Sequence, residues 1–142
     1  MAFFRFLNLG LASIFLLFSV SCQQEKTLFK KITPKQSGIT FENTIITNDS
    51  FNTITYEDIY NGGGVAVGDF NNDGLQDLFF TGNMVSSKLY INKGNLQFED
   101  ITEQAGVTTD RWCTGVSVFD INQDGFDDIY IAVAGYHDAD KR

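Results

Sequence analysis

Short apolar and β-branched runs, separated by turn-forming residues, set the pattern along this chain. Between residues 27 and 60 these runs show no convincing period of 3.6 residues, so we predict irregular strands there rather than helices. The runs are Leu28–Phe29, Ile39–Phe41, Thr44–Thr47 and Ile54–Tyr56. From residue 61 onward, strands rich in small or apolar residues alternate with polar, glycine-containing loops. The pattern as a whole predicts an all-β fold.

An internal repeat dominates the second half of the chain. Its first copy covers Gly64–Phe80 and its second covers Gly115–Ile131. Asp69 and Asp120 are equivalent, and they stand 51 residues apart. Each copy predicts a strand, a polar loop and a second strand. A repeat of this length is close to one blade of a β-propeller.

The first copy continues into a second predicted hairpin. Its arms are Lys88–Asn92 and Gln97–Thr102, and Gly94 lies in the turn, where a positive φ is often needed. Four strands per repeat is the blade pattern. The second copy is followed only by a polar stretch after Gly135, so about one and a half blades are present. We therefore expect a piece of a longer propeller.

Both copies carry the loop pattern D-x-N-x-D-G-x-x-D. Calcium takes six to eight oxygen ligands, and alternate loop positions can supply them from side chains while the seventh position offers its backbone carbonyl. Three aspartates per loop nearly balance or slightly exceed a divalent charge, and Mg²⁺ fits less well because it demands octahedral geometry. The predicted Ca²⁺ ligands are Asp69, Asn71, Asp73, Leu75 and Asp77 in the first loop, and Asp120, Asn122, Asp124, Phe126 and Asp128 in the second.

The loop pattern also resembles two other kinds of loop. An EF-hand needs a bidentate Glu at position 12, where this chain has Phe80 and Ile131, and its flanks are helices. A plain polar turn would also use Asp, Asn and Gly. Two matching loops at a blade-like spacing favour ion binding, with a role in stiffening the structure.

The first 21 residues have the layout of a secretory signal peptide. Arg5 provides a positive start and Leu9–Phe18 an apolar core, and Ser21 and Cys22 follow. This end resembles a bacterial lipobox, which implies lipidation of Cys22. Ser19 stands where that motif prefers Leu, so ordinary secretory cleavage stays open. A retained membrane anchor is the other alternative, although the apolar run is shorter than the usual ~20 residues.

Charge and residue types narrow the classes of function. Ten basic against eighteen acidic residues give a net charge of −8, which disfavours nucleic-acid binding. No catalytic triad, zinc-ligand spacing or phosphate-binding loop is present, and we expect no enzyme activity. Gly62–Gly64 is interpreted as close packing, Cys113 as a buried thiol, and both Asp127 and His137 as solvated.

The stretch from Asn61 to Gly74, and the later Lys88–Asn95 and Phe98–Thr102, resemble the FG-GAP/VCBS repeat. The resemblance covers about residues 60 to 135. It implies a seven-bladed β-propeller with Ca²⁺ in the loop between the first two strands of a blade. With the lipobox, the chain looks like lipoproteins of the Bacteroidetes type.

The expected organisation has three parts. Residues 1–21 form the signal peptide, with Cys22 lipidated; residues 23–60 form a tether and lead-in strands; residues 61–142 form the repeats. The expected function is a secreted or outer-membrane, calcium-binding scaffold for adhesion or binding, anchored by lipid, whose partner is a protein or a glycan. The alternative is a non-catalytic part of a larger envelope enzyme or glycan-uptake assembly.

Overall fold

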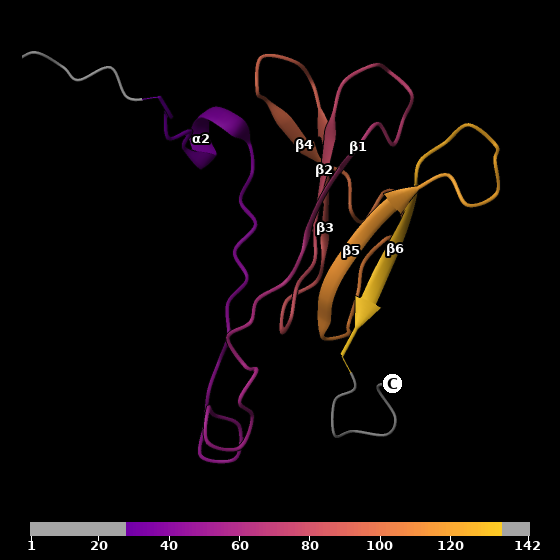
Figure 1. Cartoon of the computed structure of the whole chain (residues 1–142). Helices are drawn as coiled ribbons and strands as arrows, with labels where there is room; N and C mark the ends of the chain where they lie inside the picture. The colour runs from indigo at the N-terminus through magenta and orange to yellow at the C-terminus, as the bar shows by residue number, and fades with distance from the viewer. Residues whose placement is uncertain (1–27, 135–142) are drawn as a thin grey trace, which may run out of the picture. The chain divides into compact units, whose positions relative to one another are not determined.

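The computed structural model describes residues 28–134, which form one short helix and two antiparallel β-sheets (Figure 1). The described residues from Ile32 onward form one compact unit. The elements are α2 (Pro34–Ser37), β1 (Val65–Gly68), β2 (Asp77–Phe80), β3 (Lys88–Asn92), β4 (Phe98–Asp100), β5 (Cys113–Phe119) and β6 (Asp128–Val133). The all-β prediction is confirmed.

The first sheet is an antiparallel meander in the order β1-β2-β3-β4. The predicted second hairpin is present as β3 and β4, and Gly94 has a φ of 83° in its turn. Two left-handed residues, Asn95 and Leu96, follow Gly94 and complete the reversal. The sheet therefore contains the four strands expected of one complete repeat.

The second sheet is the β5–β6 hairpin, and its pairing copies that of β1–β2. Gly68 pairs with Asp77 in the first sheet, and Phe119 pairs with Asp128 in the second. Both members of the second pair lie 51 residues beyond those of the first. The sequence repeat is thus a repeat of strand register as well.

The core lies between the two sheets. Ala66, Phe79 and Leu89 come from three adjacent strands and are opposite one another in the register. Apolar side chains of the second hairpin pack against this row: Val116, Val118, Ile129 and Ile131. Burial of these side chains supplies the main driving force for holding the hairpin against the sheet.

Small residues on β1 allow the second hairpin to approach closely. Ala66 and Gly68 are the buried positions of β1, whereas Val65 and Val67 are exposed. A β-carbon added at Gly64 would lie 3.0 Å from the Cγ1 of Val116, and one added at Gly68 would lie 3.0 Å from the Cγ1 of Val118. The apolar pattern alone does not reveal this, because here the smaller residues of the strand face inward.

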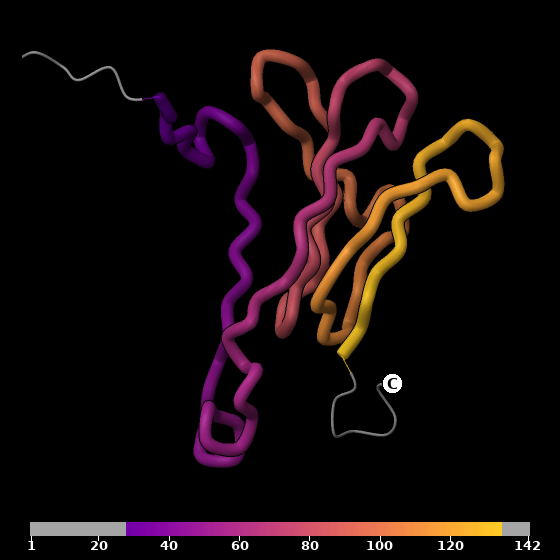
Figure 2. Tube along the Cα trace, in the orientation of Figure 1, coloured from indigo at the N-terminus to yellow at the C-terminus, as the bar shows by residue number. Residues whose placement is uncertain are grey.

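The lead-in segment differs from its prediction, because residues 28–60 contain no β-strand. Instead, Pro34 begins the single helical turn of α2, the side chain of Gln36 accepts a hydrogen bond from the Thr33 amide, and Gly38 ends the turn with a φ of 78°. Figure 2 shows the following residues as an extended trace that doubles back before β1. Within residues 28–134, the predicted β-prone runs pair with no strand.

The lead-in segment is nevertheless attached to the first sheet by side-chain contacts. The Phe41 and Phe80 rings stack with centroids 5.2 Å apart. The Thr40 amide donates a hydrogen bond to the Tyr90 hydroxyl at 3.3 Å. No helix in the described residues is long and apolar enough to cross a membrane. The predicted signal peptide and the Cys22 lipidation site lie outside the described residues.

Candidate metal centre

The first D-x-N-x-D-G loop joins β1 to β2 and is closed by its own side chains. Asp69 precedes the turn, and its two carboxylate oxygens accept hydrogen bonds from the amides of Asp73 at 3.0 Å and Gly74 at 2.8 Å. Gly74 has a φ of 85°, a conformation that glycine adopts without a steric penalty. The sixth position of the loop is therefore a glycine because the sharp reversal there requires a positive φ.

The next two predicted ligands complete this arrangement. The Asn71 side-chain oxygen accepts from the Asp73 amide at 3.0 Å, while its nitrogen donates to the Asp73 carboxylate at 2.9 Å. The other Asp73 oxygen accepts from the Leu75 amide at 2.8 Å. The side chains of Asp69, Asn71 and Asp73 are thus hydrogen-bonded to the backbone of the turn, and those of Asn71 and Asp73 are also bonded to each other.

The second loop, between β5 and β6, reproduces the same bonds. Asp120 accepts from the amides of Asp124 at 3.1 Å and Gly125 at 2.8 Å. Asn122 bonds to Asp124 through both its oxygen and its nitrogen, and Asp124 accepts from the Phe126 amide at 2.9 Å. Identical networks in two independent stretches of sequence indicate that the pattern specifies the loop conformation.

Position 9 differs between the two loops. Asp77 is fully buried at the start of β2, and it accepts hydrogen bonds from the amides of Phe70 at 3.0 Å and Asn92 at 2.8 Å. Its counterpart Asp128 is half-buried and accepts from the Ile121 amide at 3.0 Å. The extra bond to Asp77 comes from β3, which has no counterpart in the two-stranded sheet.

Burial raises the pKa of Asp77 above its ordinary value. The hydrogen bonds from Asn92 and Phe70 oppose this rise, and the nearby carboxylates of Asp73 and Asp69 reinforce it. Three carboxylates in one loop therefore interact unfavourably when all are ionised. A bound cation would remove that repulsion.

Two hydrogen bonds join the loops to each other. The Asn72 side chain donates to the Gly125 carbonyl at 3.0 Å, and the Asp69 amide donates to the Asp127 carboxylate at 3.2 Å. The prediction that Asp127 is merely solvated is therefore wrong. It rested on alternation along a strand, but β6 begins only at Asp128, so Asp127 belongs to the loop and reaches its neighbour.

The donor set suits a hard cation, although the side chains are not clustered as a metal site. Each loop offers three carboxylates and an amide oxygen, and among the described residues the carbonyls of Leu75 and Phe126 accept no hydrogen bond. In the same residues, no group of three His, Cys, Asp or Glu side chains stands close enough to hold a metal ion. Instead, the carboxylates accept hydrogen bonds from backbone amides of the loops.

The other residues singled out in the sequence have roles in packing where the structure describes them. Cys113 is fully buried at the start of β5, as predicted, and its thiol donates to the Arg111 carbonyl at 3.4 Å. Gly63 packs against the backbone of Thr81 and Gly64 against Val116, which confirms close packing at these two glycines, whereas a β-carbon at Gly62 would meet nothing within 4 Å. His137 lies outside the described residues. Sequence reasoning missed Asn72, Asn92 and Asp127, whose partners are 15 to 58 positions away in the chain.

Comparison with known proteins supports the repeat assignment. The family model described as an FG-GAP-like repeat matches residues 69–131, a span that contains both loops and all strands from β2 to β5. No match was found among curated proteins or among solved structures. Together with the repeated strand register, the match identifies a β-propeller-type repeat region.

Proposed function

We propose that both D-x-N-x-D-G loops bind Ca²⁺ and thereby stiffen a β-propeller repeat region, in keeping with the match of residues 69–131 to an FG-GAP-like repeat. The observation that carries the proposal is the shared hydrogen-bond network of the two loops. The network fixes the turn that carries the side-chain oxygens, although the carboxylates would still have to move closer together to hold an ion. Less ordering is then needed when the ion binds.

The ligands would be the residues predicted from the sequence. Asp69, Asn71, Asp73 and Asp77 would supply side-chain oxygens in the first loop, and Leu75 its carbonyl. Each carboxylate oxygen that accepts one amide bond retains a second lone pair. Calcium would supply charge neutralisation, most of all for buried Asp77, whose raised pKa reflects its burial and its two acidic neighbours.

The second loop would bind more weakly than the first. Asp128 is half-buried and accepts one backbone hydrogen bond, whereas Asp77 is fully buried and accepts two. A ligand held by more contacts loses less freedom on binding. Binding at either loop stabilises the folded state by mass action.

Thermal unfolding in calcium and in magnesium tests this proposal. We expect millimolar Ca²⁺ to raise the melting temperature, by several degrees at saturation, and equal Mg²⁺ to raise it much less. Asp73→Ala combined with Asp124→Ala should abolish the calcium effect. Asp110→Ala is a matched control, since Asp110 is an exposed aspartate outside both loops. An unchanged melting temperature in calcium would contradict the proposal.

At the level of the cell, we propose a non-catalytic binding or adhesion scaffold held at the envelope by lipid on Cys22. The support is the lipobox-like sequence and the absence of recognisable catalytic motifs in the sequence. The alternative is a non-catalytic part of a larger envelope enzyme or glycan-uptake assembly. Labelling with radioactive palmitate tests the anchor, because Cys22→Ala should lose the label while Cys113→Ala, which changes the buried thiol, should keep it.

A further inference from the structure

A pocket of about 340 Å³ lies at the end of the strands opposite the two D-x-N-x-D-G loops, called the acidic loops below. It is formed by the β2–β3 connection and by the segment that leads into β5. Its lining residues are Asn83, Met84, Val85, Ser86, Thr109, Asp110, Arg111 and Trp112. The antiparallel strand order places the β1–β2 and β5–β6 loops at one end and these connections at the other (Figure 1).

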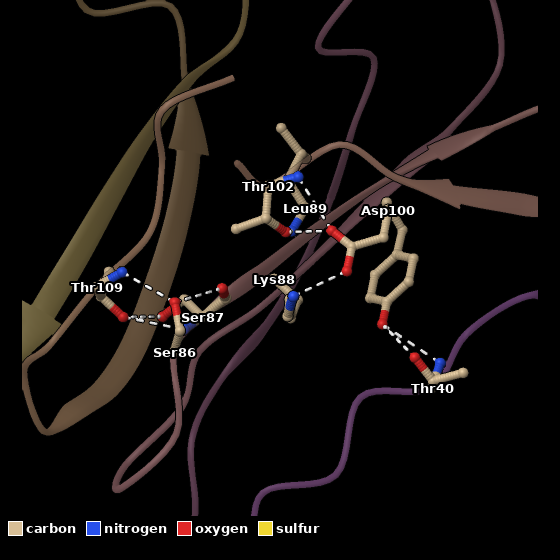
Figure 3. Close-up of polar contacts among 9 residues, drawn as sticks. Thr40, Ser86, Ser87, Lys88, Leu89, Asp100, Thr102 and Thr109 are labelled. Carbon is tan, nitrogen blue, oxygen red and sulfur yellow. Dashed lines mark hydrogen bonds and ion pairs between the residues drawn. The ribbon is translucent and has the colours of Figure 1, made fainter. Parts of the chain in front are cut away.

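The pocket walls are held in place by hydrogen bonds between the two connections. The Thr109 amide donates to the Ser86 hydroxyl at 3.0 Å, and its own hydroxyl donates to that of Ser87 at 2.9 Å (Figure 3). Asn83 is likewise engaged, because its side chain donates to the carbonyls of Gly62 and Cys113. These polar groups already have hydrogen-bond partners within the protein. They hold the two connections together, so the pocket is formed without a ligand.

Arg111 is different from the other polar lining residues. Its Nη1 is buried and has no hydrogen-bond partner within the described part of the chain. Its Nε meets the carboxylate of Asp110 at 3.3 Å, but Asp110 is 86% exposed, so this ion pair is weak. A buried donor without an acceptor is unfavourable, and such a group in a folded protein calls for an explanation.

Part of the pocket wall is apolar. Trp112 lines the pocket beside Met84 and Val85, and its ring makes a T-shaped contact with that of Phe51 at a centroid distance of 5.7 Å. Indole faces bind the apolar faces of aromatic rings and of sugars. Arg111 lines the pocket and its side chain is 36% exposed, so a ligand there can meet the guanidinium with an acceptor and the apolar wall with a ring.

We propose that this pocket binds a carboxylate attached to a six-membered ring, with Arg111 receiving the carboxylate and Trp112 the ring. A carboxylate matches the guanidinium fork better than a neutral acceptor does. The volume is at the lower end of that of ligand pockets, about 300–1,000 Å³, which suits a single ring. The ring could belong to an acidic sugar or to an aromatic acid, since both present the same chemistry. The proposal is independent of calcium binding at the opposite end.

Trp112 is the only tryptophan of the chain, so intrinsic fluorescence reports directly on the pocket. The purified full chain would be titrated with glucuronate and with benzoate, and with glucose and benzyl alcohol as neutral counterparts. We expect a saturable change with one or both carboxylates, and binding weaker by about tenfold or more for the neutral counterparts. The carboxylate that binds more tightly identifies the source of the ring.

Arg111→Gln should weaken carboxylate binding to the level of the neutral ligands, and Arg111→Lys should restore it only in part because it lacks the planar fork. Lys93→Gln is the matched control, as Lys93 is an exposed base in the β3–β4 turn at the other end of the sheet. Circular dichroism confirms that each variant is folded. Absence of a saturable response in the folded wild type, or an equal response in Arg111→Gln, would overturn the proposal.

Discussion

The carboxylate of Asp127 accepts a hydrogen bond from the backbone amide of Asp69, 58 positions earlier, at 3.2 Å. Asp69 is the first residue of one acidic loop and Asp127 the eighth of the other. The bond therefore links two consecutive repeats at the place where each would bind its ion. A second link, from Asn72 to the Gly125 carbonyl, lies nearby.

Removing the Asp127 carboxylate should loosen the contact between the repeats. We expect Asp127→Ala to lower the free energy of unfolding by about 1–2 kcal/mol, the range for a partly exposed hydrogen bond to a charged group. Urea denaturation followed by circular dichroism measures this change. Glu57→Ala is the control, since Glu57 is an exposed acid in the lead-in segment. Equal stability of the two variants would show that the bond contributes nothing.

The glycine run before β1 should tolerate no added side chain at Gly63, where a β-carbon would collide with the backbone of Thr81. We expect Gly63→Ala to destabilise the fold by about 1–3 kcal/mol, as overpacking does. Gly115→Ala is a matched control in a strand, because its β-carbon would meet only the Cβ of Ala132 at an ordinary 3.7 Å. Melting temperatures of the two variants make the comparison, and equal losses would contradict the packing argument.

The raised pKa of Asp77 predicts a specific pH dependence in calcium-free buffer. The folded protein holds the Asp77 proton more tightly than the unfolded chain, because burial disfavours the carboxylate. The Asp77 contribution to the free energy of unfolding is therefore full below the unfolded pKa, near 3.8, and is lost as the pH rises through the raised folded value.

Asp77→Asn removes the titrating carboxylate, so comparison with the wild type isolates the contribution of Asp77 to stability. The stability of the wild type relative to Asp77→Asn should fall as the pH rises above about 4, as followed by urea denaturation at several pH values. Asp128→Asn serves as the matched variant in the second loop, where the carboxylate is less buried. A difference between wild type and Asp77→Asn that stays constant or grows with pH would contradict the assigned direction.

Local sequence predicted the parts of this molecule that depend on local rules. The loop pattern and the positions of Gly74 and Gly94 follow from turn chemistry, and the strands around them follow from apolar alternation. The same rules failed between residues 28 and 60. There the β-prone runs pack through side chains such as Phe41 against a completed sheet, and one helical turn forms because Thr33, Pro34 and Gly38 favour its two ends.

Contacts between distant positions escaped prediction for a physical reason. Asn92 bonds to Asp77 only because β3 pairs with β2, and Asp127 reaches Asp69 only because the second hairpin packs on the first sheet. The side chain of Arg111 gives no indication in the sequence that one of its nitrogens is buried. The repeat itself was readable because it occurs twice, and its match to an FG-GAP-like repeat confirms that assignment.

Calorimetric titration of the full chain with Ca²⁺ tests the central claim most directly. We predict saturable binding of two ions per chain, with dissociation constants of about 10⁻⁴–10⁻³ M as in extracellular calcium modules. Asp73→Ala should remove one site, Asp124→Ala the other, and the double variant both. No binding up to several millimolar Ca²⁺ by a folded protein, or binding that survives in the folded double variant, would contradict the account.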